Sequence, residues 1–189
     1  SLLWFLLLFA LFQWTVQRED ENATELALIQ TRTLFSSIVN TRGWNMDRGG
    51  VWANEQPDCQ PNPWLPEDQR TILTQDGRRL VRLNPAYMTR QIAERFQSKT
   101  MNFHICSLSP KRPQNRPDQW ETGALLSFDA GKTERFELVP GRGGTFYRYM
   151  APLRAEKSCL QCHQRNKLGD VLGGISVSIS AFPILASVE

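Results

Sequence analysis

The chain opens with a run of apolar residues that carries no charge. The first sixteen residues, SLLWFLLLFALFQWTV, place leucine, phenylalanine and tryptophan on every side of a helix. A helix that is apolar all round is normally buried in protein or in lipid. At about 1.5 Å per residue the run is shorter than the roughly 30 Å hydrocarbon core of a bilayer. We therefore predict that residues 1–16 are the outer part of a truncated transmembrane anchor, with Trp14 at the membrane interface.

A charged start and an apolar stripe characterise the next segment. Acidic residues near its beginning favour a helix N-terminus, and Leu28, Phe35 and Val39 recur at helical spacing. This pattern predicts a juxtamembrane helix over residues 17–43 that leads into the folded domain and ends near Gly43.

The remaining chain alternates between strand and helix signals. The expected elements are a hairpin over 70–83, a helix over 84–96, a strand over 101–108, a helix over 117–131, a hairpin over 134–153 and a final strand over 171–180. Asn84 and Pro85 suit the start of the first helix, and Gly131 suits the end of the second. Tight hairpins imply antiparallel pairing. We expect an α+β fold, with one antiparallel sheet of about five strands flanked by helices over residues 44–182, followed by a tail at 183–189.

The composition limits the class of function. The chain has 189 residues, which suits one domain plus an appended segment, and its 41% hydrophobic and 22% charged residues are ordinary. The net charge is +3, and lysine and arginine are scattered without a dense block. We therefore expect no nucleic-acid partner. No nucleophile and base stand in a recognisable arrangement, so we expect no enzymatic activity.

The strongest chemical signal is the stretch CLQCH near the end of the chain. Covalent haem attachment joins two cysteine sulfurs to the two vinyl groups of the porphyrin, and a spacing of three brings Cys159 and Cys162 to one side of a turn. The next residue, His163, is then placed to bind the iron as proximal ligand. We predict one covalent haem c at this site.

Two other chemistries use such a cysteine pair. A thioredoxin-like dithiol requires a βαβ setting, and the sequence does not predict one. Zinc is the second alternative, because His104 and Cys106 together with Cys159 and Cys162 form a Cys₃His ligand set. The zinc interpretation leaves His163 without a role.

Seven blocks of the sequence resemble the Tll0287-like haem-c-binding family, also called DUF3365. They are TRGWNMDRGGVWA, PNPWL, LNPAYMTRQIAE, PDQWE, YRYMAPL, CLQCH and GDVLGGISVSIS, in order from about Leu34 to Ser180. The resemblance implies a PAS-like fold, an antiparallel sheet flanked by helices with one covalent haem. It also implies a role as the extracytoplasmic input domain of sensor kinases, chemoreceptors or cyclases. The sequence to Glu189 departs from that pattern, because it contains neither a second membrane span nor an output domain.

The ligand on the other face of the iron stays open. Met88 lies on a predicted helix inside a family block, and it is our first candidate for the distal axial position. Met46 on a glycine-rich loop, His104 on a strand, and the cysteines Cys59 and Cys106 are alternatives.

Two cysteines are candidates for a disulfide, and four arginines are candidates for contacts with the haem. Cys59 and Cys106 are a candidate disulfide, because a spare pair outside the cytoplasm tends to oxidise. Four arginines are candidates to pair with haem propionates: Arg42, Arg48, Arg78 and Arg148.

Two functions follow from these features. In the first, the chain is a single-pass protein of the cell membrane whose haem domain, on the periplasmic or extracytoplasmic side, senses redox state or a small diatomic ligand such as NO or CO. In the second, it is an electron-transfer cytochrome c that partners or belongs to a membrane complex. The membrane, a gas ligand or redox partner, and a second copy of the chain are the partners that these interpretations include.

Overall fold

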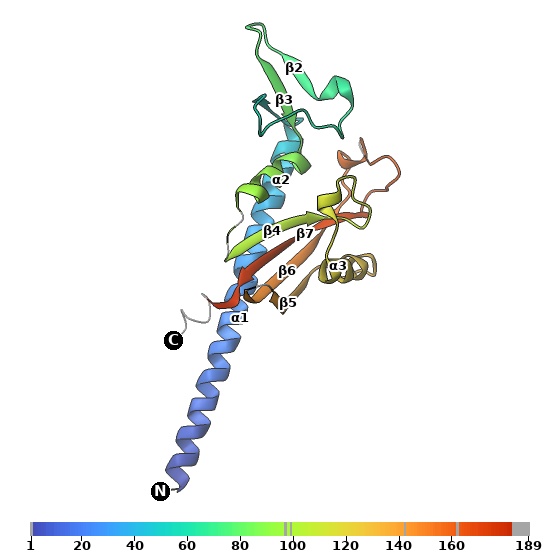
Figure 1. Ribbon diagram of the computed structural model, residues 1–189. Coiled ribbons are helices and arrows are strands. Elements are labelled where there is room, and N and C mark those ends of the chain that lie inside the picture. The colour runs from blue at the N-terminus through green and yellow to red at the C-terminus, as the bar shows by residue number, and fades with distance from the viewer. Residues whose placement is uncertain (1, 97, 99, 142, 162, 183–189) are drawn as a thin grey trace.

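The computed structural model describes residues 2–96, 98, 100–141, 143–161 and 163–182. Its helices are α1 (Leu2–Asp47), α2 (Pro85–Arg95) and α3 (Gln119–Asp129), with short 3-10 turns η1 (Glu67–Gln69), η2 (Pro113–Asn115) and η3 (Cys159–Gln161). Its strands are β1 (Val51–Asn54), β2 (Thr71–Leu73), β3 (Arg79–Leu83), β4 (Met101–Cys106), β5 (Arg135–Gly141), β6 (Gly144–Arg154) and β7 (Val171–Ser180). Figure 1 shows α1 as a long rod along which the rest of the chain is arranged.

Seven strands form two antiparallel sheets. The larger has the order β4-β7-β6-β5, and the smaller has the order β1-β3-β2. The α+β class and the antiparallel pairing were expected, but the single sheet of about five strands was not found. The difference comes from the short strand β1, whose four residues are too few to show an alternating pattern, and which holds the β2–β3 hairpin in a separate sheet.

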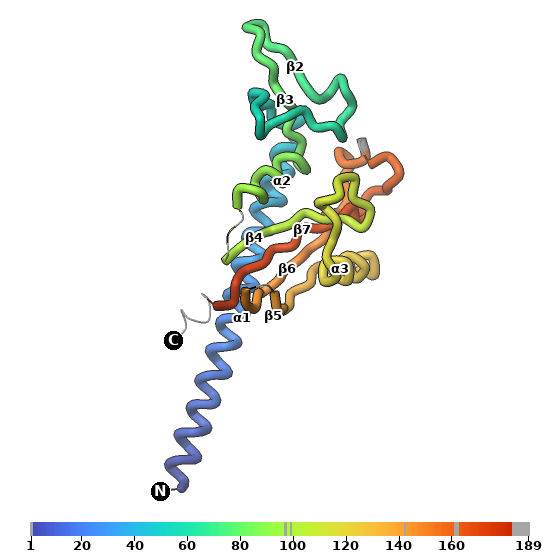
Figure 2. The backbone as a smooth tube through the Cα atoms, in the orientation of Figure 1, coloured from blue at the N-terminus to red at the C-terminus, as the bar shows by residue number. Residues whose placement is uncertain are grey.

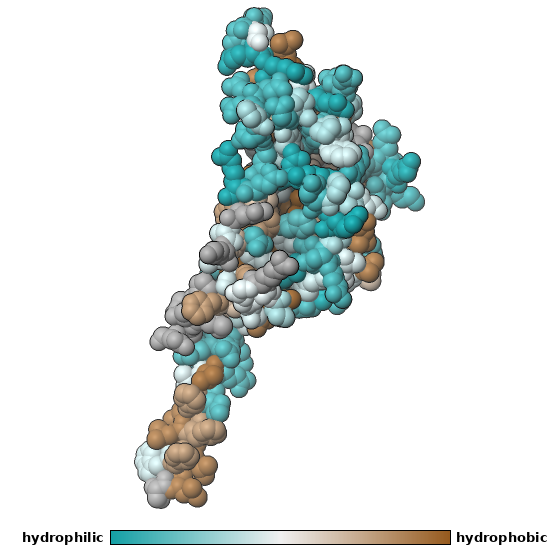
Figure 3. All heavy atoms as spheres, viewed as in Figure 1, coloured by the Kyte–Doolittle hydropathy of each residue, from teal (hydrophilic) through white to brown (hydrophobic). Residues whose placement is uncertain are grey.

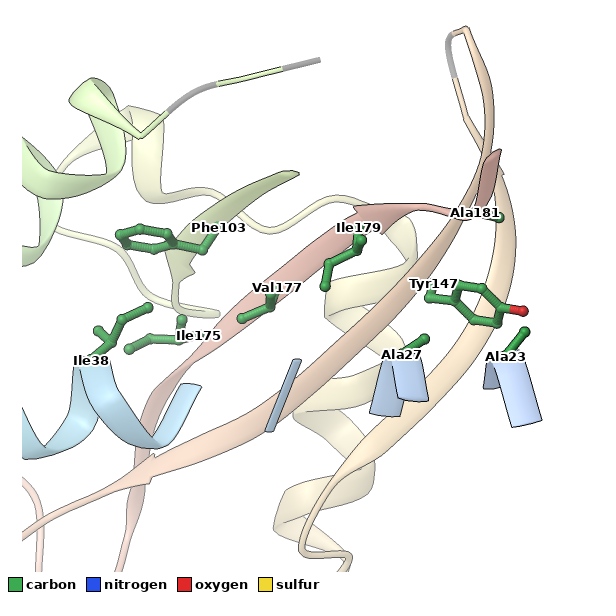
Figure 4. Close-up of a cluster of buried hydrophobic side chains, with 9 residues drawn as sticks. All are labelled: Ala23, Ala27, Ile38, Phe103, Tyr147, Ile175, Val177, Ile179 and Ala181. Carbon is green, nitrogen blue, oxygen red and sulfur yellow. The ribbon is translucent and has the colours of Figure 1, made fainter. Parts of the chain in front are cut away.

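The larger sheet is covered by a helix on each face. Alternate residues of a strand point to opposite faces, so Val177 of β7 packs toward α1 while Ser176 points toward α3. Figure 4 shows Ala23, Ala27 and Ile38 of α1 facing the apolar side chains of the sheet. The small alanines let the helix backbone approach the strands closely. This contact fixes the middle of α1, from Ala23 to Ile38, against the sheet.

The local signals for helix ends are confirmed. The Asn84 side chain accepts a hydrogen bond from the Tyr87 backbone N–H at the start of α2. Asp118 and Glu121 form a capping box at the start of α3, and Gly131, with a φ of 98°, follows its end. The hairpin predicted over 70–83 is present and turns at Gly77, which has a φ of 80°.

The transmembrane anchor predicted for residues 1–16 is wrong. Among the helices that the structure describes, none combines the length and the apolar character needed to cross a membrane. The apolar run from Leu2 to Val16 covers about 22 Å of helix, and charged residues follow from Arg18 onward in the same helix. The predicted single-pass placement in the cell membrane, with an extracytoplasmic domain, depended on this anchor and is therefore wrong as well.

The helix predicted over residues 17–43 is part of a longer one. It begins at Leu2 and continues through Gly43 to Asp47, for 46 residues. Figure 3 shows apolar surface gathered at its free end, where Leu2, Trp4 and Phe5 are each more than two thirds exposed. The predicted tail at 183–189 lies outside the described residues.

Candidate functional site

The CLQCH stretch lies in a loop between β6 and β7. In Figure 2 this orange loop projects from the end of the larger sheet that lies toward the smaller one. Two backbone hydrogen bonds close its base, from Ala155 N–H to Asp170 O (2.8 Å) and from Gly169 N–H to Ala155 O (2.9 Å). The loop is therefore a closed unit on the ends of two central strands.

Cys159 and His163 lie in one turn of this loop. The backbone N–H of His163 donates to the carbonyl oxygen of Cys159 at 3.0 Å, which is the spacing of one helical turn. Cys162, predicted to form the second thioether, lies outside the described residues. Haem attachment and ligation by these residues stay predictions.

The surroundings of His163 favour the neutral form of its imidazole. The residue is exposed, but protein atoms around the ring, together with the positive charge of Lys111, lower its pKa below the ordinary value. Neutral imidazole is the form that binds a metal ion. His163 also borders a pocket of about 170 Å³, whose other lining residues include Ser107, Leu125 and Val171.

Arg42 is a partly buried arginine of α1. Burial lowers the pKa of Arg42 to about 10, and the opposing effect comes from the charge of Cys159. Arg42 lies near the C-terminal end of α1, and its Nη1 donates to the Pro85 carbonyl oxygen at 3.1 Å and to Thr89 Oγ1 at 2.8 Å. These two hydrogen bonds join the C-terminal end of α1 to the first turn of α2.

The structure does not bring Met88 and His163 together. Met88 lines a different pocket, of about 330 Å³, beside Cys59. Its Sδ accepts a hydrogen bond from Asn45 Nδ2 at 3.4 Å. Met46, the next candidate, lies partly buried in the last turn of α1. Distal ligation by Met88 stays a prediction.

His104 and Cys106 instead gather around a buried carboxylate. Their ligand atoms and those of Glu121 lie within 4.8 Å of one another, and among the described residues Cys159 is not part of this group. The Cys₃His zinc set is thus not assembled in the described part of the chain. Glu121 was missed from the sequence, although the Asp118-x-x-Glu121 spacing is a signal for a capping box.

Three hydrogen bonds and an ion pair converge on the Glu121 carboxylate. It accepts from His104 Nδ1 (3.0 Å), from the Asp118 backbone N–H (2.9 Å) and from the Ser176 hydroxyl, and Arg148 Nη2 lies at 3.4 Å. Burial raises the pKa of Glu121, but the hydrogen bond and charge of His104 outweigh that effect, so the pKa is lowered. This Glu121 cluster is internally satisfied, which leaves His104 and Cys106 without a need for a metal ion.

The two spare cysteines are not joined. Cys59 and Cys106 are both free thiols in the structure. Cys59 packs with Val81 and Tyr87 near the smaller sheet, whereas Cys106 packs with the α3 side of the larger sheet. Because they belong to different clusters, the predicted disulfide is absent.

The four candidate arginines differ in their ion-pair partners and in their exposure. Arg148 is paired with Asp118 and Glu121, and Arg78 is paired with Asp76 at the exposed hairpin turn. Arg48 is exposed in the turn after α1. Arg42 is partly buried, and no ion pair between described residues includes it.

The donor set suits a covalently attached haem. A cysteine sulfur and a neutral imidazole in one turn are the residues that attachment and proximal ligation require. The residues present therefore fit the group, with Cys159, Cys162 and His163 as those that would hold it.

Comparison with known proteins identifies the family. The Tll0287-like family model matches residues 17–180. The crystal structure of Tll0287, described as a cyanobacterial heme-protein, has 16% sequence identity and a TM-score of 0.39, covering 51% of this chain and 69% of that one. No curated protein matches the sequence. Because the family model covers most of the chain, the resemblance of the seven blocks is confirmed, and the chain belongs to the Tll0287-like family.

Proposed function

We propose that the chain is a mono-haem c-type protein, in which Cys159 and Cys162 bind the porphyrin and His163 binds the iron. The observation that carries the proposal is the turn that joins Cys159 to His163 through a 3.0 Å backbone hydrogen bond. Family membership and the heme-protein description of Tll0287 support it. A bound haem supplies one-electron redox chemistry and, where a coordination position is open, binding of diatomic ligands.

Attachment requires only the two thiols from this chain. Each thiol adds across one vinyl group, so that a carbon–sulfur bond forms and the thiol hydrogen passes to the other vinyl carbon. The closed base of the β6–β7 loop limits the freedom of the turn, which keeps His163 near the ring edge to which its neighbours are joined.

The test is whether the haem is covalent. Protein made in cells that attach haem c should keep its haem through acid–acetone extraction, with one haem added per chain by mass spectrometry. A Cys162→Ala variant should lose most of the retained haem, whereas Cys59→Ala, which alters a cysteine outside the turn, should retain it. Haem that is fully extracted from the unsubstituted protein, or zinc in its place, would overturn the proposal.

Within that function we favour sensing of redox state or of a diatomic ligand. The CLQCH loop joins β6 and β7, which pack against α1, so a change at the iron would act on strands that contact the helix organising the molecule. Electron transfer is the alternative, and the exposure of His163 favours it, because a cofactor near the surface exchanges electrons readily with a partner. Rapid CO binding to the reduced protein would favour sensing, and a six-coordinate iron that excludes CO would favour the carrier.

A further inference from the structure

The side of α1 that faces away from the sheet carries a regular series of exposed residues. Alternating steps of three and four lead along it through Phe5, Leu8, Phe12, Thr15, Glu19, Asn22, Leu26, Ile29, Thr33, Ser36 and Asn40. All are exposed except Glu19, which is partly exposed and is the only charged residue of the series. This spacing is the seven-residue repeat with which helices pair in coiled coils. We call these residues the outer seam.

The outer seam lies opposite the contact of α1 with the larger sheet. Ile29 follows the buried Ala27 by two residues, which is about 200° around an α-helix. The described part of the chain therefore leaves the seam uncovered, with Leu26 42% exposed and Ile29 52% exposed. The side of α1 that the sheet does not use is free for a partner.

The hydroxyl groups of the seam are already satisfied within the helix. The Thr15 hydroxyl donates to the Leu11 carbonyl oxygen at 2.9 Å, and the Thr33 hydroxyl donates to the Ile29 carbonyl oxygen at 2.8 Å. Such groups can be buried by a partner without leaving a donor unpaired. The outer seam can therefore enter a protein contact without loss of these hydrogen bonds.

A second copy of this chain provides a helix with a matching repeat. In a parallel pair each seam residue meets its own counterpart, so the apolar end with Phe5 and Phe12 meets an apolar end. An antiparallel pair would set these phenylalanines against Ser36 and Asn40 and lose that apolar contact. The distribution of apolar residues along the seam thus favours the parallel direction.

The residues that flank the seam are compatible with a parallel pair. One flank carries Glu25 and Arg32, and the other carries the uncharged Gln30 and Ser37. In a parallel pair each flank faces the opposite flank of the partner, so charged residues face neutral ones. Glu19 is the exception, because it meets its own counterpart inside the seam. A polar residue at such a position specifies the register at a cost in stability.

We propose that α1 pairs in parallel with α1 of a second copy along the outer seam, which makes the chain a dimer with its two sheets on the outside. The pairing uses no residue of the CLQCH loop. Its test is therefore separate from the test of haem attachment.

Disulfide cross-linking of full-length single-cysteine variants tests the direction of the pair. Leu8→Cys and Asn40→Cys, near opposite ends of the seam, should both form covalent dimers on mild oxidation. Ala10→Cys and Thr41→Cys are exposed positions outside the seam and should remain monomeric on a non-reducing gel. All variants share the native cysteines, so these controls also measure the background. Linkage of Asn22→Cys alone, in the middle of the seam, would indicate an antiparallel pair and overturn the proposal.

Sedimentation equilibrium tests the seam itself. Ile29→Lys should raise the dissociation constant of the dimer roughly tenfold or more, because each copy would bury an unpaired charge. Glu19→Leu should lower the constant, since it replaces the meeting of like charges by an apolar contact. Thr41→Lys adds the same charge as Ile29→Lys outside the seam and should leave the constant unchanged. A chain that is monomeric at all concentrations, or equal constants for the two lysine variants, overturns the inference.

Discussion

Glu121 is a carboxylate with only 2% of its surface exposed, and His104 is its closest charged partner. Both ring nitrogens of His104 face acceptors, Nδ1 the carboxylate and Nε2 the Gln114 carbonyl oxygen, each at 3.0 Å. An imidazole that faces two acceptors must donate from both nitrogens, so it is held as imidazolium. The hydrogen bond to Glu121 accordingly raises the pKa of His104.

This geometry predicts that stability falls as the pH rises. Folded protein binds the His104 proton more tightly than unfolded protein, so the contribution is complete below the ordinary pKa of 6.5 and is lost as pH rises through the folded-state value. Glu121, with its lowered pKa, stays ionised across this range. Urea unfolding at a series of pH values should show the decline, and His104→Gln should flatten it. A wild-type curve as flat as that of the variant would contradict the assignment.

A second prediction at this scale concerns the axial ligand. If Met88 binds the iron, oxidised protein should show the weak sulfur-to-iron absorption band of His/Met ligation, and Met88→Ala should abolish it. Ligation would also require Met88 Sδ to give up its hydrogen bond with Asn45. Met46→Ala removes the next candidate ligand and is therefore the comparison variant. A spectrum lost in Met46→Ala and kept in Met88→Ala would reverse the assignment.

At the scale of elements, the contact of α1 with the larger sheet depends on small side chains. Ala23 and Ala27 are almost completely buried against the strands. Arg32 Nε reinforces the contact by donating to Glu134 at 2.9 Å, and the Tyr149 hydroxyl donates to the same carboxylate at 3.0 Å. The helix is therefore held by the close packing of its alanines against the strands and by the Arg32–Glu134 ion pair beside them.

We expect Ala27→Leu to destabilise the fold by roughly 1–3 kcal/mol, because the added atoms overpack the seat of α1. Ala10→Leu makes the same substitution in the exposed part of the helix and should leave stability unchanged. Chemical denaturation of both variants measures the difference. Equal effects at the two positions would show that α1 is not seated through Ala27.

At the scale of the whole molecule, local features were predictable and contacts distant in sequence were not. The Cys159–His163 turn and the Asn84 cap depend on neighbours a few residues apart, so their spacing was sufficient to identify them. The Glu121 cluster depends on β4 and β7 lying side by side under α3, which no spacing in the sequence specifies. The short strand β1 gave too weak a pattern to predict the second sheet.

The exposed apolar end of α1 leads to a prediction for the whole molecule. Leu2, Phe5 and Leu8 are each more than 60% exposed, and large apolar surfaces favour association. Sedimentation should show concentration-dependent assembly that disappears when residues 1–16 are deleted. The first fully buried position of α1 is Ala23, so the truncated chain should keep its fold and circular dichroism. Assembly that survives the deletion would place the association surface elsewhere.

The unbroken course of α1 has a mechanical consequence. With a pivot at Thr31, in the middle of its seat, the arm to Arg42 has 11 residues, about 17 Å, and the arm to Leu2 has 29 residues, about 44 Å. If a stiff helix tilts about this point, the end of the long arm moves more than twice as far as the end of the short arm. The apolar end of α1 would therefore be the part of the molecule that moves most if the helix tilted.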